Sequence, residues 1–407
     1  MNFANLTRRE FVGVTATLPV WSSISPTLSA ASGDPPSSPV ATGFDPWLEI
    51  RPSALRANVT EISRRAGGRP VLAVIKNNGY GLGLETVGPV LDAHEAVSGL
   101  AVVKVDEALR LRKAGVKKPV LLMGHFTPAE GIELLRLDIR LAPFGDDAPQ
   151  LLEQVGREAG RPAAVHFYID TGMSRLGMPY HQALPWMERV AGVRDVRIEG
   201  TFMTFTEDDA FDLEQLSRFT ALADRARARR IPLGRLHAAS SHALFMRPQA
   251  HLDMVRTGLA LYGAYPSEVP ETERRGLEPA LRLRARVVRV QQLRAGDSVS
   301  YGRAYIAPAP TWIATIPVGH SDGYPRSAVK GCEVLIGGRL YKVIGAVSAS
   351  HTIVELGVEQ TVQVGDVATL VGPDHPAILP NAVAERAGVS VYDVLMHLSA
   401  ELPKAVV

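Results

Sequence analysis

The chain has 407 residues, of which 46% are hydrophobic and 21% are charged, and its formal net charge is +2. This composition is typical of a globular protein that is long enough for two domains. A charge so close to zero gives no electrostatic reason to expect a nucleic acid or an anionic membrane as partner. After the short apolar segment near the N-terminus, no segment is apolar for long enough to span a bilayer, so we expect no membrane span in the mature protein. The one cysteine, Cys332, cannot form an intramolecular disulfide, and we expect it to be a small buried hydrophobic residue.

The N-terminus has the pattern of an export signal. An Arg8-Arg9 pair precedes a modestly apolar segment over residues 12–21, and a stretch rich in Ser and Ala follows. This pattern predicts a twin-arginine signal peptide over residues 1–31, and the alternative is an incidental arginine pair on a flexible tail. Residues 32–46 are rich in Pro, Ser and Gly and predict a disordered linker. We therefore expect a periplasmic protein, or a cytoplasmic one if the signal is not used.

Residues 47–278 alternate short apolar runs with amphipathic helical stretches. We expect a first helix that begins at the N-cap Ser53 and ends at Gly67-Gly68, and another over residues 106–114. The apolar runs predict strands at residues 71–75, 100–103, 120–123, 165–169, 196–200 and 233–237. Alternation at this spacing predicts parallel βαβ units, most simply an α/β fold with an N-terminal (β/α)8 TIM-type barrel.

After residue 278 the pattern changes to one of strands without intervening helices. Strand-like runs occupy residues 281–293, 312–318, 333–347 and 366–371, separated by Gly, Pro and Asp. The pair Gly337-Gly338 predicts a hairpin turn within the third run. Residues 279–407 therefore predict a C-terminal, mostly-β domain. A helical stretch over residues 391–401 is expected near the end of the chain.

A lysine follows the first predicted strand of the barrel. Lys76 comes directly after residues 71–75 and before a turn rich in Asn and Gly. In TIM-type barrels the chemistry takes place where the strands end. Desolvation and neighbouring cations favour a neutral amine, so Lys76 could form a Schiff base. The motif alone would favour a simpler alternative, a strand lysine that extends to solvent.

Four further motifs, found in order along the chain, favour the Schiff-base lysine over a lysine that extends to solvent. The five segments are AVIKNNGYGLG (73–83), DTGMSRLG (170–177), HAASS (237–241), VRTGLALYG (255–263) and VSYGR (299–303). Together they make residues 47 to about 404 resemble the alanine racemase family, fold-type III enzymes that use pyridoxal 5′-phosphate (PLP). The resemblance implies an α/β barrel followed by a β domain, PLP as cofactor and a small amino acid as substrate. It also implies racemisation between L and D forms and a homodimer.

The resemblance also implies which residues bind the cofactor. Lys76 would hold PLP covalently, and Arg256 would face the pyridine nitrogen. Phosphate contacts are implied for Tyr80, Ser241, Gly258, Leu259 and Tyr392. A permanently charged arginine can only donate to the ring nitrogen, so the ring stays unprotonated and simple proton exchange at Cα is favoured over side reactions.

Two catalytic bases are implied on opposite sides of the reacting carbon. Lys76 would be one, and Tyr301 would be the other, acting in the active site of the partner subunit. Arg175 would contact the substrate carboxylate and Tyr301, which suits its planar fork of donors. Taken alone, a tyrosine that packs at an interface would be the simpler interpretation of Tyr301. No metal ligands are implied.

Several positions depart from the family pattern. Tyr168 stands where many members carry a lysine that holds the arginine, Thr204 replaces a histidine near the cofactor ring, and His320 replaces a tyrosine at the mouth of the site. Ala349 and Ser350 stand where typical members have Met and Asp, which narrow the substrate pocket from the partner subunit. These smaller, uncharged residues predict a pocket that also admits Ser, Lys, Arg or other non-alanine substrates. The alternative is sequence drift with alanine still preferred.

Two other classes of function remain as alternatives. One is a non-catalytic PLP-binding barrel, which the presence of a β domain with Tyr301 argues against. The other is a fold-type III decarboxylase, and these usually place a glutamate where this chain has Arg256. The departures at Tyr168 and Thr204 also leave open a catalytically weakened member of the family.

Overall fold

The computed structural model describes Gly43 and residues 45–407. The predicted signal peptide over residues 1–31 and most of the predicted linker over residues 32–46 lie outside the described residues. Within the described part of the chain, no helix is both long and apolar enough to cross a membrane.

The first region is a ring of parallel strands in the order β2-β3-β4-β5-β6-β8-β9. The strands are β2 (Val71–Val74), β3 (Val97–Val102), β4 (Val120–Leu122), β5 (Ile139–Leu141), β6 (Ala163–Asp170), β8 (Val196–Phe202) and β9 (Arg235–His237), with the short β7 (Met178–Pro179) beside β6. An extended segment over residues 255–257, the closing segment, completes the ring beside β2. Leu72 N donates to Val255 O and Val74 N donates to Thr257 O, each at 2.8 Å. This segment takes the place of the eighth strand, so the predicted TIM-type barrel is confirmed.

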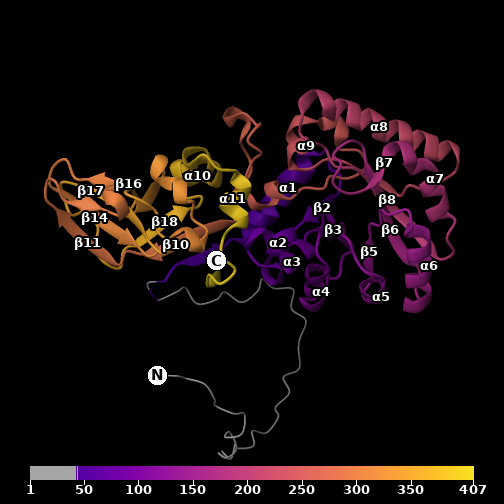
Figure 1. The fold of residues 1–407 in the computed structure, drawn as a ribbon, viewed down its shortest axis with the longest axis horizontal. Helices are drawn as coiled ribbons and strands as arrows, with labels where there is room; N and C mark the ends of the chain where they lie inside the picture. Colours follow the sequence, from indigo (N-terminus) through magenta and orange to yellow (C-terminus); the bar gives the residue numbers. More distant parts are fainter. Residues whose placement is uncertain (1–42, 44) are drawn as a thin grey trace, which may run out of the picture. The chain divides into compact units, whose positions relative to one another are not determined.

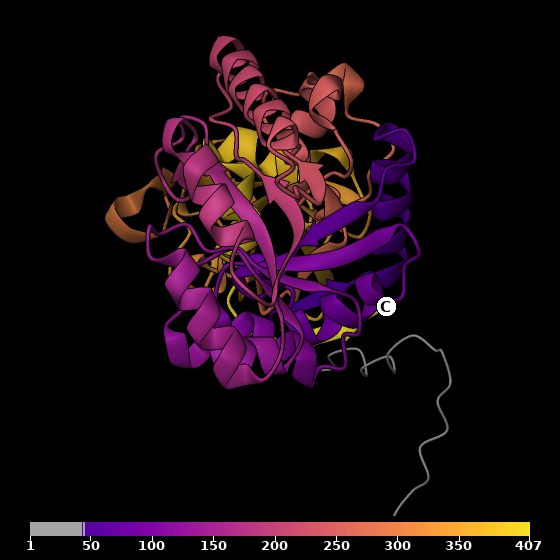
Figure 2. The same cartoon turned by 90° about the vertical axis from the view of Figure 1, so that its right-hand side faces the viewer.

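Helices surround the ring of strands, as the end-on view in Figure 2 shows. They are α1 (Pro52–Arg65), α3 (Leu84–Asp92), α4 (Val105–Lys113), α5 (Pro128–Arg136), α6 (Ala148–Ala159), α7 (Tyr180–Ala191), α8 (Asp209–Ala228) and α9 (Ser241–Met246). The element α2 (Lys76–Tyr80) is a single left-handed turn at the end of β2. Their apolar faces pack on the strands; Leu55, Val59 and Ile62 of α1, for example, are fully buried. The expectation that Ser53 caps α1 is wrong. The helix begins at Pro52 without a side-chain cap, at a position where proline needs no amide partner.

The second region is a nine-stranded sheet, coloured orange to yellow in Figure 1 except for its N-terminal strand. Its order is β11-β14-β17-β16-β15-β18-β10-β1-β19. The strands are β1 (Trp47–Ile50), β10 (Leu281–Arg286), β11 (Arg289–Leu293), β14 (Thr311–Ile316), β15 (Glu333–Ile336), β16 (Arg339–Ile344), β17 (Thr352–Gly357), β18 (Val367–Val371) and β19 (Lys404–Val406). All neighbours are antiparallel except β1 and β19. Trp47–Ile50 therefore belongs to this sheet, although we expected it at the start of the barrel.

Smaller elements complete this region. They are the two-stranded pair β12 (Ser298–Val299) and β13 (Tyr305–Ile306) and the helices α10 (Pro380–Ala387) and α11 (Val391–Met396). Short 3-10 helices lie at η1 (Pro248–Ala250), η2 (Leu259–Tyr262), η3 (Glu271–Glu273), η4 (Tyr301–Arg303), η5 (His320–Asp322), η6 (Arg326–Lys330) and η7 (Pro376–Ile378). The hairpin predicted at Gly337-Gly338 joins β15 to β16, and Cys332 is fully buried, as predicted. The last predicted helix is shorter than expected and ends at Met396.

Candidate active site

A cavity of about 520 Å³ opens where the barrel strands end. This volume lies within the usual range for small-molecule sites. Most of its lining residues lie at or just after the ends of β2, β3, β4, β6, β8 and β9, which is the end of a barrel that carries chemistry. Eight residues with predicted roles line it: Lys76, Tyr80, Arg175, Ser241, Arg256, Gly258, Leu259 and Tyr392.

A left-handed turn positions Lys76 and Tyr80. Asn77, Asn78, Gly79 and Tyr80 all have positive φ angles, between 53° and 63°. Such a conformation costs most residues about 1–2 kcal/mol, and Asn and Gly tolerate it best, which explains the Asn-Asn-Gly sequence. The ring of Tyr80 is held by stacking on another tyrosine ring at 4.6 Å. The turn therefore stores strain at a functional site while it fixes both side chains.

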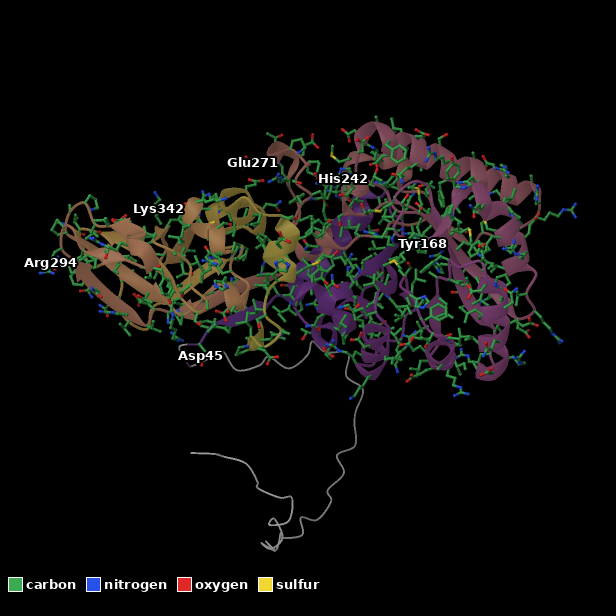
Figure 3. The ribbon with its side chains drawn as sticks, in the orientation of Figure 1. Asp45, Tyr168, His242, Glu271, Arg294 and Lys342 are labelled. Carbon is green, nitrogen blue, oxygen red and sulfur yellow. The ribbon has the colours of Figure 1, made fainter. Side chains whose placement is uncertain are left out.

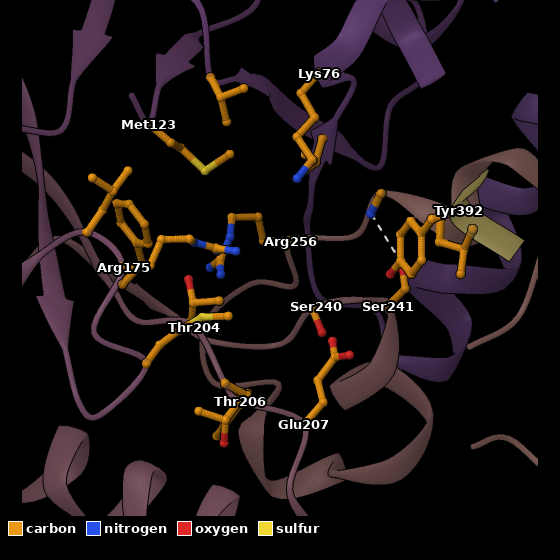
Figure 4. A pocket seen from close by; sticks show the side chains of 18 of the residues that line it. Lys76, Met123, Arg175, Thr204, Thr206, Glu207, Ser240, Ser241, Arg256 and Tyr392 are labelled. Atoms are coloured by element: carbon orange, nitrogen blue, oxygen red, sulfur yellow. Dashed lines mark hydrogen bonds between the residues drawn. The ribbon is translucent and has the colours of Figure 1, made fainter. Parts of the chain in front are cut away.

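The amine of Lys76 points into the cavity beside two arginines (Figure 4). Burial lowers its pKa, the charges of Arg175 and Arg256 lower it further, and Glu107 acts in the opposite direction. Because the neutral amine is the nucleophilic form, this lowered pKa increases the reactive fraction at neutral pH. The alternative of a lysine that simply extends to bulk solvent does not fit this geometry.

One end of the cavity is lined by hydroxyl and amide groups, which we call the donor cup. Its members are Tyr80, Ser241, Gly258, Leu259 and Tyr392. Ser241 Oγ accepts hydrogen bonds from Gly258 N at 3.2 Å and Ala260 N at 3.1 Å, so its own proton is available to a ligand. A Cβ at residue 258 would lie 2.1 Å from Tyr80 Oη, so only glycine fits there.

The tyrosines of the donor cup stay protonated. Burial raises the pKa of both Tyr80 and Tyr392, which keeps their hydroxyl groups as donors at neutral pH. A phosphate group needs several donors and close approach of the backbone. The donor cup meets both requirements, so these residues fit the phosphate of PLP.

Arg256 lies in the middle of the cavity and is buried (Figure 4). It donates to Met203 O at 2.8 Å, to His237 Nδ1 at 3.2 Å and to His237 O at 3.3 Å. Its guanidinium carbon lies 5.1 Å from the centre of the Phe202 ring, a cation–π contact. Burial lowers the pKa of Arg256 to about 10, so the group stays charged at neutral pH. These contacts support Arg256 without a histidine at residue 204.

The bond to Arg256 fixes the tautomers of two buried histidines. A guanidinium can only donate, so His237 Nδ1 accepts and the proton of His237 lies on Nε2. That nitrogen lies 3.0 Å from His166 Nδ1, which therefore accepts in turn. Burial lowers the pKa of His166 to about 4 and that of His237 well below its ordinary value, so both rings are neutral. An uncharged pair of histidines thus holds Arg256 from inside the barrel.

Two of the departures from the family pattern contact each other. Tyr168 Oη lies 3.3 Å from Thr204 Oγ1, and the Tyr168 ring stacks on Phe202 at 4.3 Å. Tyr168 lies in the barrel, as labelled in Figure 3. Within the described residues, Arg175 has no hydrogen-bond or ion-pair partner, so nothing replaces the missing lysine as its anchor. Its guanidinium is therefore free to bind a carboxylate.

Three residues with predicted roles in the site do not line this cavity. Tyr301 is 83% exposed between β12 and β13, and Ala349 and Ser350 are exposed between β16 and β17. The two places are linked, because the serine before Tyr301 donates to Ala346 O at 3.3 Å. Ser321 N also donates to Ala349 O, at 3.0 Å. All three predicted residues thus lie on one connected set of exposed loops.

Sequence reasoning missed two contributors to the site. His237 belongs to a recognised motif, yet its contact with Arg256 depends on the meeting of β9 with the segment that closes the barrel. Glu207 lines the cavity and was not predicted. Glu207 follows the end of β8 by five residues, on the same side of the barrel as Lys76, and this position could have indicated that it lies near the site.

Family models, curated relatives and a solved structure match most of this chain. The family models "Alanine racemase, N-terminal domain" and "Alanine racemase, C-terminal domain" match residues 50–266 and 280–406. An alanine racemase from Desulforamulus reducens is 34% identical over 366 residues, which cover 88% of this chain and 98% of the relative. One from Desulfovibrio desulfuricans is 35% identical over 372 residues, with 89% and 98% covered. The solved alanine racemase of Streptomyces lavendulae has a TM-score of 0.82 at 28% identity, with 90% and 98% covered.

Proposed function

The chain belongs to the alanine racemase family and is an amino-acid racemase of that type, and from this premise we propose that Lys76 and Tyr301 of two different subunits share the catalysis. The observation that carries the proposal is the lysine itself. Its amine lies in the cavity with Arg175 and Arg256, and its pKa is lowered. Both family matches favour racemisation over the decarboxylase and the non-catalytic alternatives.

Members of this family use PLP, and the residues of this chain fit it. Lys76 would hold the cofactor, Arg256 would donate to its ring nitrogen, and the donor cup would bind its phosphate. When bound, PLP supplies an electron sink that makes the Cα proton of an amino acid easier to remove. Arg256 is held by His237 and Met203, so it presents a fixed, donor-only group.

Racemisation requires that a proton leaves Cα on one side and returns on the other. Lys76 can hold a proton on one side of the cavity. Arg175 would bind the substrate carboxylate with its planar fork, and its charge would also favour the ionised form of a nearby phenol. Tyr301 of the partner subunit would be that phenol and the second base.

The exposure of Tyr301 supports a homodimer. Tyr301 and Ile306 are 83% and 52% exposed on the same pair of short strands and their connection. Tyrosine is enriched in subunit interfaces because it offers a large apolar surface with a polar end. A second copy that covers this surface would bring Tyr301 to the cavity of its neighbour.

We further propose that the substrates extend beyond alanine. Ala349 and Ser350 lie on the loops linked to Tyr301, so a dimer that delivers Tyr301 would bring them to the same site. They are smaller than the Met and Asp of typical members and carry no charge. Side chains larger than methyl would then meet no steric barrier from residue 349, and anionic side chains would no longer be repelled by a carboxylate at residue 350.

We expect the protein to racemise L-serine, L-lysine and L-arginine as well as L-alanine. Restoring the larger typical residue with the variant A349M should lower kcat/KM for lysine about tenfold or more, because methionine would occupy space that the long side chain needs, and a misfit of one methylene changes discrimination by about 10–200-fold. Chiral chromatography after incubation with PLP measures both results.

Alanine serves as the internal control, since its methyl group does not reach the substituted wall. Its kcat/KM should change by less than about threefold in A349M. Strict alanine preference in the unsubstituted protein would refute the broad specificity and leave the racemase activity in place.

We also propose that the protein is exported by the twin-arginine route. The Arg8-Arg9 pair, the short apolar segment and the Ala-rich end support this. When the full chain is expressed in a bacterium with an active twin-arginine pathway, the protein in the periplasmic fraction should begin near residue 32. The R8K/R9K variant should remain cytoplasmic, and equal distribution of the two proteins would refute the proposal.

A further inference from the structure

Glu207 is the one carboxylate that lines the cavity within the described part of the chain, whereas Lys76, Arg175 and Arg256 there are positive. Its backbone φ is 66°, in the left-handed region that disfavours a glutamate. Asp212 of α8 holds this conformation, because its Oδ1 accepts a hydrogen bond from Glu207 N at 3.0 Å. The fold therefore keeps a strained residue in place with its side chain at the cavity.

The carboxyl group of Glu207 faces the donor cup rather than Arg175. It lies beside Ser240, which directly precedes the serine of the cup (Figure 4). Burial raises the pKa of Tyr80 and Tyr392 most, the charge of Glu207 raises both further, and all three side chains line the same cavity. Figure 4 shows Glu207 extending toward Ser240 and away from Arg175.

The groups around Glu207 disfavour its ionised form. Burial raises its pKa most, and Glu268 and Asp212 raise it further, whereas His242 and Ser240 act in the opposite direction. His242 is buried, and neither of its ring nitrogens has a hydrogen-bond partner in the described chain. This cluster is not a metal site, since no group of three or more His, Cys, Asp or Glu among the described residues could hold a metal ion.

A phosphate group in the donor cup would meet the Glu207 carboxyl. An ionised carboxylate would repel the phosphate charge strongly in this partly desolvated place. A protonated carboxyl would instead offer an O–H donor. Only the protonated form is therefore compatible with a bound phosphate.

We propose, on the basis of the cofactor site proposed above, that Glu207 binds the cofactor phosphate as a protonated carboxyl that donates a hydrogen bond. At a pH where Glu207 is ionised in the free protein, cofactor binding then includes uptake of one proton by Glu207. As pH rises, Glu207 ionises and the affinity for the cofactor falls; as pH falls, the affinity returns. Glu207 is thus a ligand of the phosphate and not a base in the reaction.

The test compares cofactor affinity in the unsubstituted protein and in Glu207→Gln. Glutamine has the same shape, keeps an N–H donor and cannot ionise. The mature protein is freed of cofactor and titrated with PLP, followed by visible absorbance, from about pH 6 to about pH 9. Comparing the two proteins at each pH cancels the titration of Lys76 and of the phosphate itself. The ratio of the Kd of the unsubstituted protein to that of the variant should rise about tenfold or more over this range.

Two controls test whether the pH dependence of PLP affinity comes from the phosphate and from Glu207. Pyridoxal, which lacks the phosphate, should show a constant ratio across the pH range. Glu271→Gln removes a charge from an exposed residue outside the cavity lining and should behave like the unsubstituted protein. If Glu207→Gln does not fold, Glu207→Asn takes its place, because asparagine tolerates a positive φ.

Several results would overturn this inference. They are a constant Kd ratio with PLP, an equal pH effect with pyridoxal, or a change in Glu207→Gln confined to the turnover of cationic substrates. Failure of the unsubstituted protein to bind PLP at any pH would instead refute the proposed cofactor site. The two failures are therefore distinguishable.

Discussion

Replacing Lys76 by alanine should abolish racemisation and remove the visible absorbance of the lysine-bound cofactor. The substitution removes both the amine that holds PLP and the base on one side of the substrate. Proton transfer by a positioned side chain contributes about 10²–10⁴-fold by itself, so the loss in kcat should be at least about 10⁴-fold when the attachment is lost as well. Chiral chromatography and an absorbance spectrum measure the two effects separately.

Lys342→Ala is the matched control for this loss. Lys342 is exposed on the nine-stranded sheet and lies outside the cavity lining, so its loss should leave both spectrum and turnover unchanged (Figure 3). If Lys76→Ala kept the absorbance band and more than about a hundredth of the turnover, Lys76 would not be the residue that carries the chemistry.

Replacing Tyr301 by phenylalanine should stop inversion while cofactor binding is retained. Tyr301 is 83% exposed and does not line the cavity of its own chain, so removal of its hydroxyl should change stability by no more than about 0.5 kcal/mol. Turnover should fall about 10²–10⁴-fold because one of two bases is lost. In D₂O, exchange at Cα should continue for one enantiomer through Lys76, without conversion to the other.

Tyr305 provides the control for Tyr301. It lies on β13, a few residues away, and its hydroxyl donates to Glu355 at 2.6 Å rather than to any group of the cavity. Tyr305→Phe should racemise alanine at the normal rate. Near-normal inversion by Tyr301→Phe would show that another group is the second base.

Much of the barrel could be predicted from the sequence because its strands are apolar runs between helical stretches. β5 was missed since it has three residues with a charged one, Arg140, at its centre. Arg140 tolerates that position because it pairs with Glu199 and Asp138. The closing segment was missed for a similar reason, since it contains Arg256. β1 was assigned to the wrong region because its partners β10 and β19 are distant in the sequence.

The candidate site was predictable only where local motifs carried it. The contact between Tyr168 and Thr204 joins residues 36 apart, and that between His166 and His237 joins residues 71 apart. Neither follows from a pattern along the chain, because parallel strands decide which residues meet. The proposed position of Tyr301 depends on a second copy, which one sequence does not describe.

The most direct test of a shared active site is to mix two inactive variants, Lys76→Ala and Tyr301→Phe. In a mixed dimer, one site would combine an intact Lys76 with an intact Tyr301 from the other subunit, and the second site would lack both. Random exchange of equal amounts makes half of the dimers mixed, so about one quarter of the normal activity should return. Recovery to that level would establish catalysis across the interface. No recovery, with mixed dimers verified, would contradict it.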